Sequence, residues 1–333
     1  MSKIEWTEKT WNPVVGCSVT SPGCKNCYAM KMAGRLEAMT EKSGHADHYL
    51  GTTKKVNDKT VWTAKIGVAP DAVFEQPLRR KKPTTYFVNS MGDLFHPNVP
   101  IAEIDRVFAV MALSPQHKFQ ILTKYPERMR DHVKRYETDE WADLYAMDML
   151  WGMIKDFEHG KRRDELEHLL DYENEETGLC SKPDLWPHVL LGASVEDQKR
   201  ADERRDYLKE VSEMCWKTFV SYEPALGPVN WSGWDFLDWL IVGGESGPNA
   251  RPVHPDWARN ARGYCQINEI AFFFKQWGKY LPHGQLSSHG SHAIFYDVEP
   301  TKLDDGHLTY AAGKKAAGRL LDGVEHNEQI DWP

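Results

Sequence analysis

The sequence of 333 residues has no long apolar segment. A helix that crosses a membrane needs about 20 consecutive apolar residues, and no run of that length occurs. The first residues, MSKIEWTEKT, show neither the apolar core of a secretory signal nor the Arg-rich pattern of a transit peptide. We therefore expect a cytoplasmic protein without membrane contact.

Positive charge is also in short supply. The chain holds 41 Lys and Arg against 49 Asp and Glu, for a net charge of -8. Sequence-independent binding to nucleic acid depends on a basic excess, so any such contact must be local. The candidates for phosphate contacts are Lys124, Arg128, Arg251 and the cluster Arg79–Lys82. For the cluster, a solvated entry to the following strand is the alternative.

Cysteine is scarce, at six residues, and in the cytosol thiols stay reduced. Cys17, Cys24 and Cys27 fall within eleven residues. The other three are scattered: Cys180, Cys215 and Cys265. This uneven spacing favours a metal site over a framework of disulfides.

Short apolar, β-rich runs recur along the chain and alternate with amphipathic helical patterns, as in 101–113 and 197–211. The runs are Trp11–Val15, Thr85–Asn89, Phe119–Leu122, Val189–Ala193, Thr218–Ser221, Trp239–Val242 and Ala271–Phe274. This order predicts an α/β fold, a full or partial (β/α) barrel in one domain over 1–333, with an open doubly wound sheet as the alternative. An acidic helical insertion is expected at 131–186 and a C-terminal extension at 280–333.

Polar side chains follow the predicted strands. They include Asn89, Ser90 and Asp93; Thr123, Lys124 and Arg128; Ser194 and Glu196; Ser221 and Glu223; Glu245, Ser246 and Arg251; Lys275 and Gln276. Ligands of parallel α/β sheets bind at the carboxyl ends of the strands, so this set predicts a polar cavity there. Each single residue has the alternative of a helix cap or loop contact.

The most specific pattern is GCSVTSPGCKNCYA, in which the cysteines have the spacing C-x6-C-x2-C. Three thiolates from one loop suit a four-iron four-sulfur (4Fe-4S) cluster with one open iron. A structural zinc site needs four ligands, so zinc would need a distant residue such as His45 or His48. The third alternative is that these three thiols bind no metal.

The segments IEWTEKTWNPVVGC, SPGCKNCYA, FVNSMGDLF, ILTKYPERM, GASVEDQ, FVSYEP, IVGGESGPNARP, FFFKQWG and KKAAGRLLDG resemble the phage Gp37/Gp68 family, a three-Cys-motif family related to radical S-adenosylmethionine (SAM) enzymes. The resemblance implies a partial (β/α)6-type TIM barrel of the radical SAM kind, with the cluster on the loop after the first strand. If the chain is phage-encoded, its location is the host cytoplasm. It departs from the usual pattern in having six residues between the first two cysteines, and Asn26 where an aromatic residue precedes the last.

The resemblance also implies a mechanism: the reduced cluster cleaves SAM to a 5′-deoxyadenosyl radical, which abstracts hydrogen from a substrate. By the superfamily's layout, Asn89, Ser90 and Asp93 would face the methionine moiety, and Ser194 and Glu196 the ribose. Across the barrel, we expect Glu223, Glu245, Arg251 and Lys275 to be catalytic residues that contact the substrate. A structural Glu245–Arg251 ion pair is the alternative.

No second closely spaced cysteine motif occurs, which favours redox-neutral chemistry, an isomerisation, rearrangement or lyase reaction. The family's association with phages suggests a modified nucleic-acid base or its appended group, in phage DNA modification, with a free nucleoside or a peptide as alternatives. A flavodoxin or ferredoxin is the expected electron donor. The competing function is a zinc-stabilised nucleic-acid-binding or interaction module without redox chemistry.

Overall fold

The computed structural model describes residues 4–43, 46–137, 186–286 and 298–331. Its centre is a sheet of seven strands in the order β1-β6-β7-β8-β9-β10-β11, with every neighbouring pair parallel. The strands are β1 (Lys9–Trp11), β6 (Thr85–Val88), β7 (Lys118–Thr123), β8 (Val189–Ser194), β9 (Lys217–Tyr222), β10 (Trp239–Gly243) and β11 (Ala271–Gln276).

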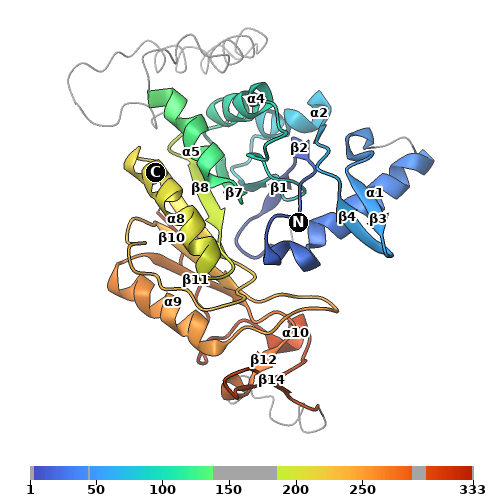
Figure 1. Ribbon diagram of the computed structural model, residues 1–333. Helices are drawn as coiled ribbons and strands as arrows, with labels where there is room; N and C mark the ends of the chain where they lie inside the picture. Colours follow the sequence, from blue (N-terminus) through green and yellow to red (C-terminus); the bar gives the residue numbers. More distant parts are fainter. Residues whose placement is uncertain (1–3, 44–45, 138–185, 287–297, 332–333) are drawn as a thin grey trace, which may run out of the picture.

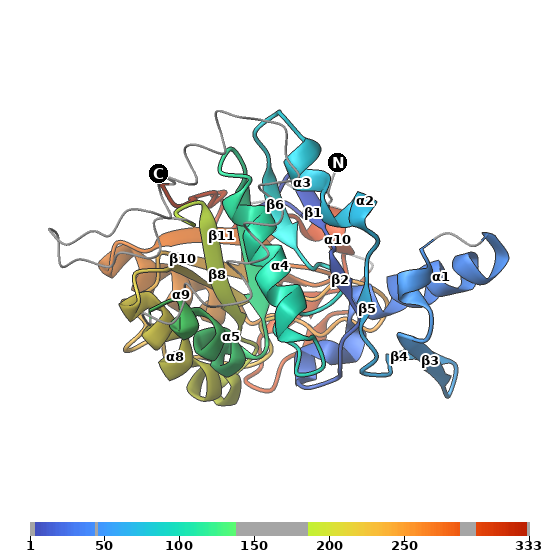
Figure 2. The same ribbon diagram turned by 90° about the horizontal axis from the view of Figure 1, so that it is seen from above.

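The strand order settles the architecture. Each connection leads to the next strand in the same direction, so the sheet curls into a partial barrel (Figures 1 and 2). A doubly wound sheet reverses its order at a switch point, which this sheet does not do. The expected partial barrel is therefore confirmed, with seven parallel strands in place of six.

The first strand lies earlier than predicted. β1 ends at Trp11, and Val14 and Val15 pair instead with Val68 and Gly67 in a separate antiparallel ladder of β2 (Val14–Val15) and β5 (Gly67–Val68). Pro13 lies between the two segments and has no N–H to donate to a strand ladder. The apolar run 11–15 is thus divided between two sheets.

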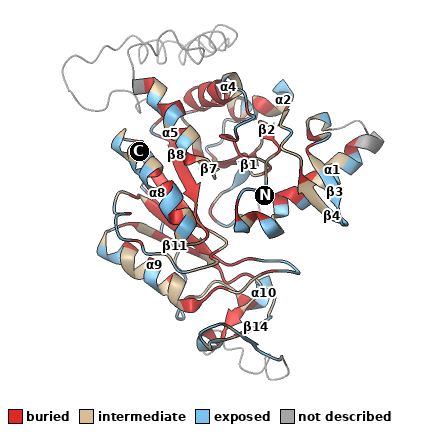
Figure 3. Ribbon diagram, in the orientation of Figure 1, coloured by how far each residue is buried: buried red, intermediate tan, exposed pale blue. Residues whose placement is uncertain are grey.

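Helices cover the outer face of the sheet (Figures 1 and 2). They are α4 (Ile101–Ala112), α5 (Pro126–Lys134), α8 (Gln198–Glu213) and α9 (Pro255–Ile267). Both predicted amphipathic helices form, and Asp197 caps α8 by accepting a hydrogen bond from the Arg200 N–H at 2.9 Å. Figure 3 shows buried strands behind helices whose outward sides are exposed.

Alternation along the strands places a second, smaller core on the inner face of the barrel. It consists of Trp6, Phe87, Leu190, Phe219, Trp239, Ile241, Phe273 and Ile330. At Gly192 a Cβ would lie 2.2 Å from the Phe219 ring, so only glycine leaves room for that ring. Side chains alternate between faces, so positions two or four residues beyond these core residues face the same interior. The polar residues at such positions are Asn89, Ser194, Ser221, Glu223 and Lys275.

Part of the segment between β1 and β6 forms an arm that projects from the barrel (Figures 1 and 2). It contains α1 (Tyr28–Ser43), η2 (Asp47–Tyr49) and the hairpin β3 (Thr53–Val56) and β4 (Lys59–Trp62). The shorter elements elsewhere in the first half are η1 (Pro22–Asn26), α2 (Asp71–Phe74), α3 (Gln76–Arg79) and η3 (Arg135–Glu137).

The C-terminal extension forms a three-stranded sheet of β12 (Leu281–Pro282), β14 (Leu308–Tyr310) and β13 (Thr301–Lys302), with η6 (His283–Gln285) and α10 (Lys314–Ala317). Its end returns to the barrel, where Phe274 N–H donates to the His326 carbonyl at 3.0 Å. Of the predicted insertion, residues 131–134 belong to α5, and 138–185 lie outside the described residues.

Two further expectations can be compared with the structure. Within the described residues, every helix is too short or too polar to cross a membrane. Cys17, Cys24, Cys27 and Cys265 are free thiols, but Cys215 is disulfide-bonded, so the expectation of six reduced cysteines is wrong at that residue.

Candidate active site at the barrel mouth

A cavity of about 400 Å³ opens at the carboxyl ends of the strands. The three clustered cysteines line it together with the inward polar residues of four strands, Asn89, Ser194, Ser221, Glu223 and Lys275. The apolar inner core forms its floor through Trp6 and Phe87. A cavity is therefore present where the sequence placed it and the predicted polar residues line it, but most of its surface is apolar.

The cysteine loop runs from Cys17 through η1 to Cys27. Cys24 is buried, and its Sγ lies 3.6 Å from the Ser21 hydroxyl. Burial raises the pKa of Cys24, but the charge of Lys124 and backbone hydrogen bonds outweigh it, so the pKa falls below its usual value. Burial raises the pKa of Cys17 and of Cys27. One thiolate is thus favoured by the protein alone.

The spacing of the three thiols distinguishes two kinds of metal site. Zn–S bonds of about 2.3 Å in a tetrahedral site bring sulfur atoms within about 4 Å of one another. Among the described residues, the three cysteines do not form a group whose ligand atoms all lie within 4.8 Å. The thiols face one cavity without converging on one ion, an arrangement open to a larger group. His45 lies outside the described residues, so that zinc alternative is not covered by the structure.

Two buried carboxylates hold the cysteine loop on the barrel, and we call Glu196 and Glu245 the loop anchors. Glu196, after β8, is fully buried and accepts a hydrogen bond from the Ser21 hydroxyl at 2.5 Å. It also pairs with Lys124, and with Arg204 at 3.0 Å. Gly23 fits against it, since a Cβ there would lie 2.7 Å from its Oε1.

Glu245, after β10, makes the second anchor. Asn26 donates to its Oε2 at 2.9 Å, and the Arg251 guanidinium donates to both its oxygens at 2.9 and 2.7 Å. Arg251 also donates to the Pro22 carbonyl at 3.0 Å. The Glu245–Arg251 ion pair, the alternative to a substrate contact, is present and joins the cysteine loop.

The exit of β6 contributes a mixed set of contacts. Asp93 is buried and accepts hydrogen bonds from the Thr123 hydroxyl at 2.6 Å and the Lys124 N–H at 2.8 Å. Its pKa is raised, chiefly by burial. Ser90 donates to Asn12 at 3.1 Å, and its carbonyl accepts from the Tyr28 hydroxyl at 3.1 Å. Asp93 and Ser90 line the cavity but are already bonded within the protein.

Asn89 differs from these neighbours. It has φ 56°, a left-handed conformation that asparagine tolerates better than most residues. Its Oδ1 accepts a hydrogen bond from the Val14 N–H at 3.3 Å, whereas its buried Nδ2 has no partner. A buried amide donor without a partner on a cavity wall is suited to a ligand acceptor.

Glu223 and Lys275 form what we call the cavity pair. Lys275 Nζ donates to Glu223 Oε2 at 2.9 Å, and both side chains line the cavity. Gly243 makes room for the carboxylate, because a Cβ there would lie 3.1 Å from the Glu223 Cδ. Gln276 also donates weakly to Glu223 at 3.4 Å, and its own buried Oε1 has no partner.

Several predicted nucleic-acid contacts have other roles. Lys124 bonds Glu196 and Ser21, and the Arg128 guanidinium donates to the carbonyls of His96 and Val99. The cluster Arg79–Lys82 precedes β6, so it lies at the amino end of the sheet, opposite the cavity. It is a solvated strand entry, with Arg79 paired to Glu75 at 2.7 Å.

The sequence analysis missed residues that the ends of the chain bring to the cavity. Ile4, Trp6 and Lys314 line it, and Lys314 donates to Glu5 at 2.9 Å. Tyr28, noted only as following the last cysteine, lines it as well. The aromatic residues beside the first strand and the cysteine loop could have indicated a place in the cavity wall. No local sequence pattern indicates it for Lys314.

A family model described as "Protein of unknown function (DUF5131)" matches residues 1–330. The comparison with curated proteins gave no match. Among solved structures, a spore photoproduct lyase double mutant with bound AdoMet and dinucleoside spore photoproduct has a TM-score of 0.37 at 11% identity, covering 91% of this chain and 67% of that chain. A single mutant of spore photoproduct lyase has a TM-score of 0.36 at 12% identity, covering 93% and 69%. TM-scores this low do not establish a common fold.

Proposed function

The chain belongs to the DUF5131 family, and we propose that this member is a radical SAM enzyme whose 4Fe-4S cluster is held by Cys17, Cys24 and Cys27. The observation that carries the proposal is one cavity lined by three free thiols that do not converge on a single ion. We also propose membership of the phage Gp37/Gp68 family, on the motifs given above.

The donor set suits such a cluster. Three thiols on one loop leave one iron open, and the positive charge of Lys124 favours the Cys24 thiolate. When bound, the cluster and SAM together supply a carbon radical that removes a hydrogen atom from the substrate. The protein's part is to hold the loop, bind the two ligands and exclude water.

Of the residues predicted to bind SAM, two keep free polar atoms toward the cavity. Asn89 offers its unpartnered Nδ2 to an acceptor such as a carboxylate, and Ser194 lines the cavity with its hydroxyl. Asp93, Ser90 and Glu196 support this wall through their bonds to neighbouring residues. We therefore assign SAM contact to Asn89 and Ser194 and a positioning role to the other three.

The substrate side is the cavity pair. Glu223 and Lys275 are joined by a hydrogen-bonded ion pair at the cavity wall. They can therefore bind a polar group of the substrate and hold or transfer a proton at Glu223 Oε2 or Lys275 Nζ. We do not assign substrate contact to Glu245 and Arg251, because they form an ion pair with each other and hydrogen bonds to the cysteine loop. Trp6, Trp62 and Phe87 give the same cavity flat apolar surfaces.

We propose a nucleobase, or a group attached to one, as the substrate. Flat aromatic walls stack bases, and the projecting arm carries local positive charge beside the cavity. Residues 25–65 hold eight Lys and Arg against four Asp and Glu, the reverse of the chain as a whole. Tyr28 and Trp62 of this arm line the cavity, so a phosphate backbone on the arm could deliver a base to it.

The reaction type follows from the cysteines. Cys265 is buried and free, and Cys215 is disulfide-bonded, so neither offers thiolates for a second cluster. A single cluster favours an isomerisation, rearrangement or lyase reaction in which the substrate has no net change of redox state. A flavodoxin or ferredoxin is the electron donor we propose.

The test is release of 5′-deoxyadenosine from SAM by the anaerobically reconstituted, dithionite-reduced protein, measured by mass spectrometry. We expect slow release without substrate, and loss of release in Cys24→Ala. Cys265→Ala is the matched control and should release the same amount. A protein that holds the cluster but never cleaves SAM would contradict the proposal.

The nucleic-acid part has its own test. Replacing Lys54 and Lys59, two exposed lysines of the hairpin, by Ala should weaken binding of an oligonucleotide and reduce its salt dependence. Lys81 and Lys82, at the far end of the sheet, provide the control variants. An equal loss of oligonucleotide binding in the two pairs of variants, or no oligonucleotide binding by the native chain, would exclude nucleic acid as the substrate. Neither result would affect the proposal of SAM cleavage.

A further inference from the structure

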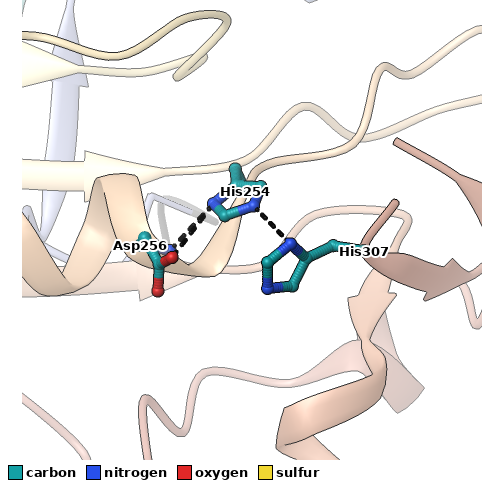
Figure 4. Close-up of side chains that lie close together, drawn as sticks. All are labelled: His254, Asp256 and His307. Atoms are coloured by element: carbon teal, nitrogen blue, oxygen red, sulfur yellow. Dashed lines mark hydrogen bonds and ion pairs between the residues drawn. The ribbon is translucent and has the colours of Figure 1, made fainter. Parts of the chain in front are cut away.

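His254, Asp256 and His307 lie close together outside the cavity, where the C-terminal extension meets α9 (Figure 4), and Asp305 pairs with both histidines. His254 and Asp256 begin α9, and Asp305 and His307 belong to the turn between β13 and β14. The sequence signals are the spacings His-x-Asp and Asp-x-His, which the sequence analysis did not single out. His254, Asp256 and His307 each place a ligand atom within 4.8 Å of the others.

Three of the ligand atoms form a compact triangle. Asp305 Oδ2 lies 2.7 Å from His254 Nε2 and 2.9 Å from His307 Nδ1. The two ring nitrogens are 3.1 Å apart. All three edges are therefore close to 3 Å, and the sequence separation of 53 residues between the histidines shows that the fold, not local spacing, brings them together.

Hydrogen bonding alone fits this triangle poorly. A ring N–H lies in the plane of its imidazole and points at one acceptor, so three mutual contacts of similar length leave at least one bent or without a proton. Ligand atoms about 2.1 Å from a metal ion and 90° apart lie about 3.0 Å from one another. The triangle thus has the dimensions of one face of an octahedral two-His, one-carboxylate site.

The other ring nitrogen of His254, Nδ1, determines whether Nε2 is free of a proton and open to a metal. In the structure Nδ1 accepts a hydrogen bond from the Asp256 N–H at 3.1 Å, and the Asp256 carboxylate lies 3.9 Å from the same nitrogen. A metal on Nε2 requires the ring proton on Nδ1. Metal binding would therefore replace the capping hydrogen bond, with the Asp256 carboxylate, which also accepts from Arg259 at 2.9 Å, as the acceptor for that proton.

We propose that His254 Nε2, His307 Nδ1 and Asp305 Oδ2 bind a divalent first-row transition-metal ion, with Zn²⁺ as the probe, and that Asp256 orients His254. Imidazole and carboxylate donors together suit this class of ion. The ion joins the β13–β14 turn to α9, and α10 follows shortly after β14 with Lys314, which lines the cavity. The site is therefore a structural clamp on the extension, and it is independent of the proposed radical chemistry.

The test is zinc content per chain after equilibrium dialysis, measured by inductively coupled plasma mass spectrometry on the intact protein. We expect one equivalent in the native chain and in the variant Cys17→Ser, Cys24→Ser and Cys27→Ser, which removes the cysteine site. His307→Ala and Asp305→Asn should bind zinc at least tenfold more weakly. His307 is half-exposed, so its replacement leaves the fold intact.

His283→Ala is the matched control, since His283 belongs to the same extension and bonds Tyr310 at 3.0 Å. It should keep the zinc. Zinc should also raise the thermal midpoint of the native chain and of His283→Ala but not of His307→Ala. No zinc in the native chain, or zinc that depends on the cysteines and survives His307→Ala, would overturn the proposal. Absence of zinc leaves the cluster proposal unaffected, whereas zinc on the cysteines would contradict that proposal as well.

Discussion

Three glutamates follow three neighbouring strands of the barrel, and two of them have a different role from the third. Glu196 and Glu245, after β8 and β10, are buried and bonded to the cysteine loop. Glu223, after β9 between them, lines the cavity as Glu245 does, but it pairs with Lys275 and not with the loop. The loop is thus fastened on both sides of Glu223. A polar residue that directly follows an apolar strand belongs to the site. The residue with which it pairs determines whether it supports the site or contacts a ligand.

The largest expected effect is on the first anchor. Glu196→Ala leaves Lys124 and Arg204 without their buried counter-charge, and removal of one partner of a buried ion pair costs about 3–5 kcal/mol of unfolding free energy. Urea denaturation followed by tryptophan fluorescence measures it. Glu203→Ala, which removes an exposed pair with Arg200, should cost less than about 1 kcal/mol. Equal losses in both variants would remove Glu196 as an anchor.

A smaller effect is expected at the second anchor. Glu245→Gln weakens the bonds from Arg251 and Asn26, but Arg251 is partly exposed and regains water, so we expect a loss of about 1–2 kcal/mol. The loop should also hold its cluster less well. Iron retained after gel filtration and substrate-free release of 5′-deoxyadenosine should therefore fall together. Full cleavage with loss of substrate turnover would instead restore Glu245 as a substrate contact.

Acid should weaken the anchors selectively. Burial raises the pKa of Glu196, but Lys124 and Arg204 outweigh it and hold the pKa below its usual value; Arg251 and Asn26 do the same for Glu245. A carboxylate with a lowered folded pKa stabilises the fold above its unfolded pKa, about 4.5, and this stability is lost as the pH falls through the folded pKa. The unfolding free energy should therefore drop below about pH 5, and less steeply in Glu196→Gln. An unchanged slope in that variant would contradict the assignment.

The smallest effect on stability is expected at the cavity pair. Glu223 and Lys275 are partly accessible from the cavity, so Glu223→Gln should change the unfolding free energy by less than about 1 kcal/mol. Cluster content and substrate-free SAM cleavage should stay at the native level, whereas turnover of a substrate should fall. Lys275→Met tests the other partner. A stability loss as large as that of Glu196→Ala would show that the cavity pair is a third anchor.

The sequence predicted the barrel because each strand is a short apolar run and each exit is polar. The predicted first strand is misplaced because Trp11, Val14 and Val15 have the pattern of one strand, although Pro13 separates them. The sequence could not separate anchors from the cavity pair, since the deciding contacts join residues 175 and 219 positions apart in Ser21–Glu196 and Asn26–Glu245. The path of the cysteine loop across the strand exits is a tertiary property that no local pattern encodes.

The same limit applies to the basic residues. Lys124 and Arg128 follow β7 and read as phosphate contacts, but the fold supplies a buried carboxylate for one and backbone carbonyls for the other. Arg79–Lys82 reads as a basic patch, yet it lies at the wrong end of the strands for the cavity. Local charge predicts function only after the end of the sheet to which it belongs is known.

The central claim is that the loop between the anchors holds a 4Fe-4S cluster on Cys17, Cys24 and Cys27. The most direct test is iron, sulfide and zinc analysis of anaerobically reconstituted protein, with its visible absorption spectrum. We predict about four iron and four sulfide per chain and a brown protein, with both lost in Cys17→Ala, Cys24→Ala or Cys27→Ala and retained in Cys265→Ala. A colourless protein with stoichiometric zinc on these three cysteines would contradict the claim.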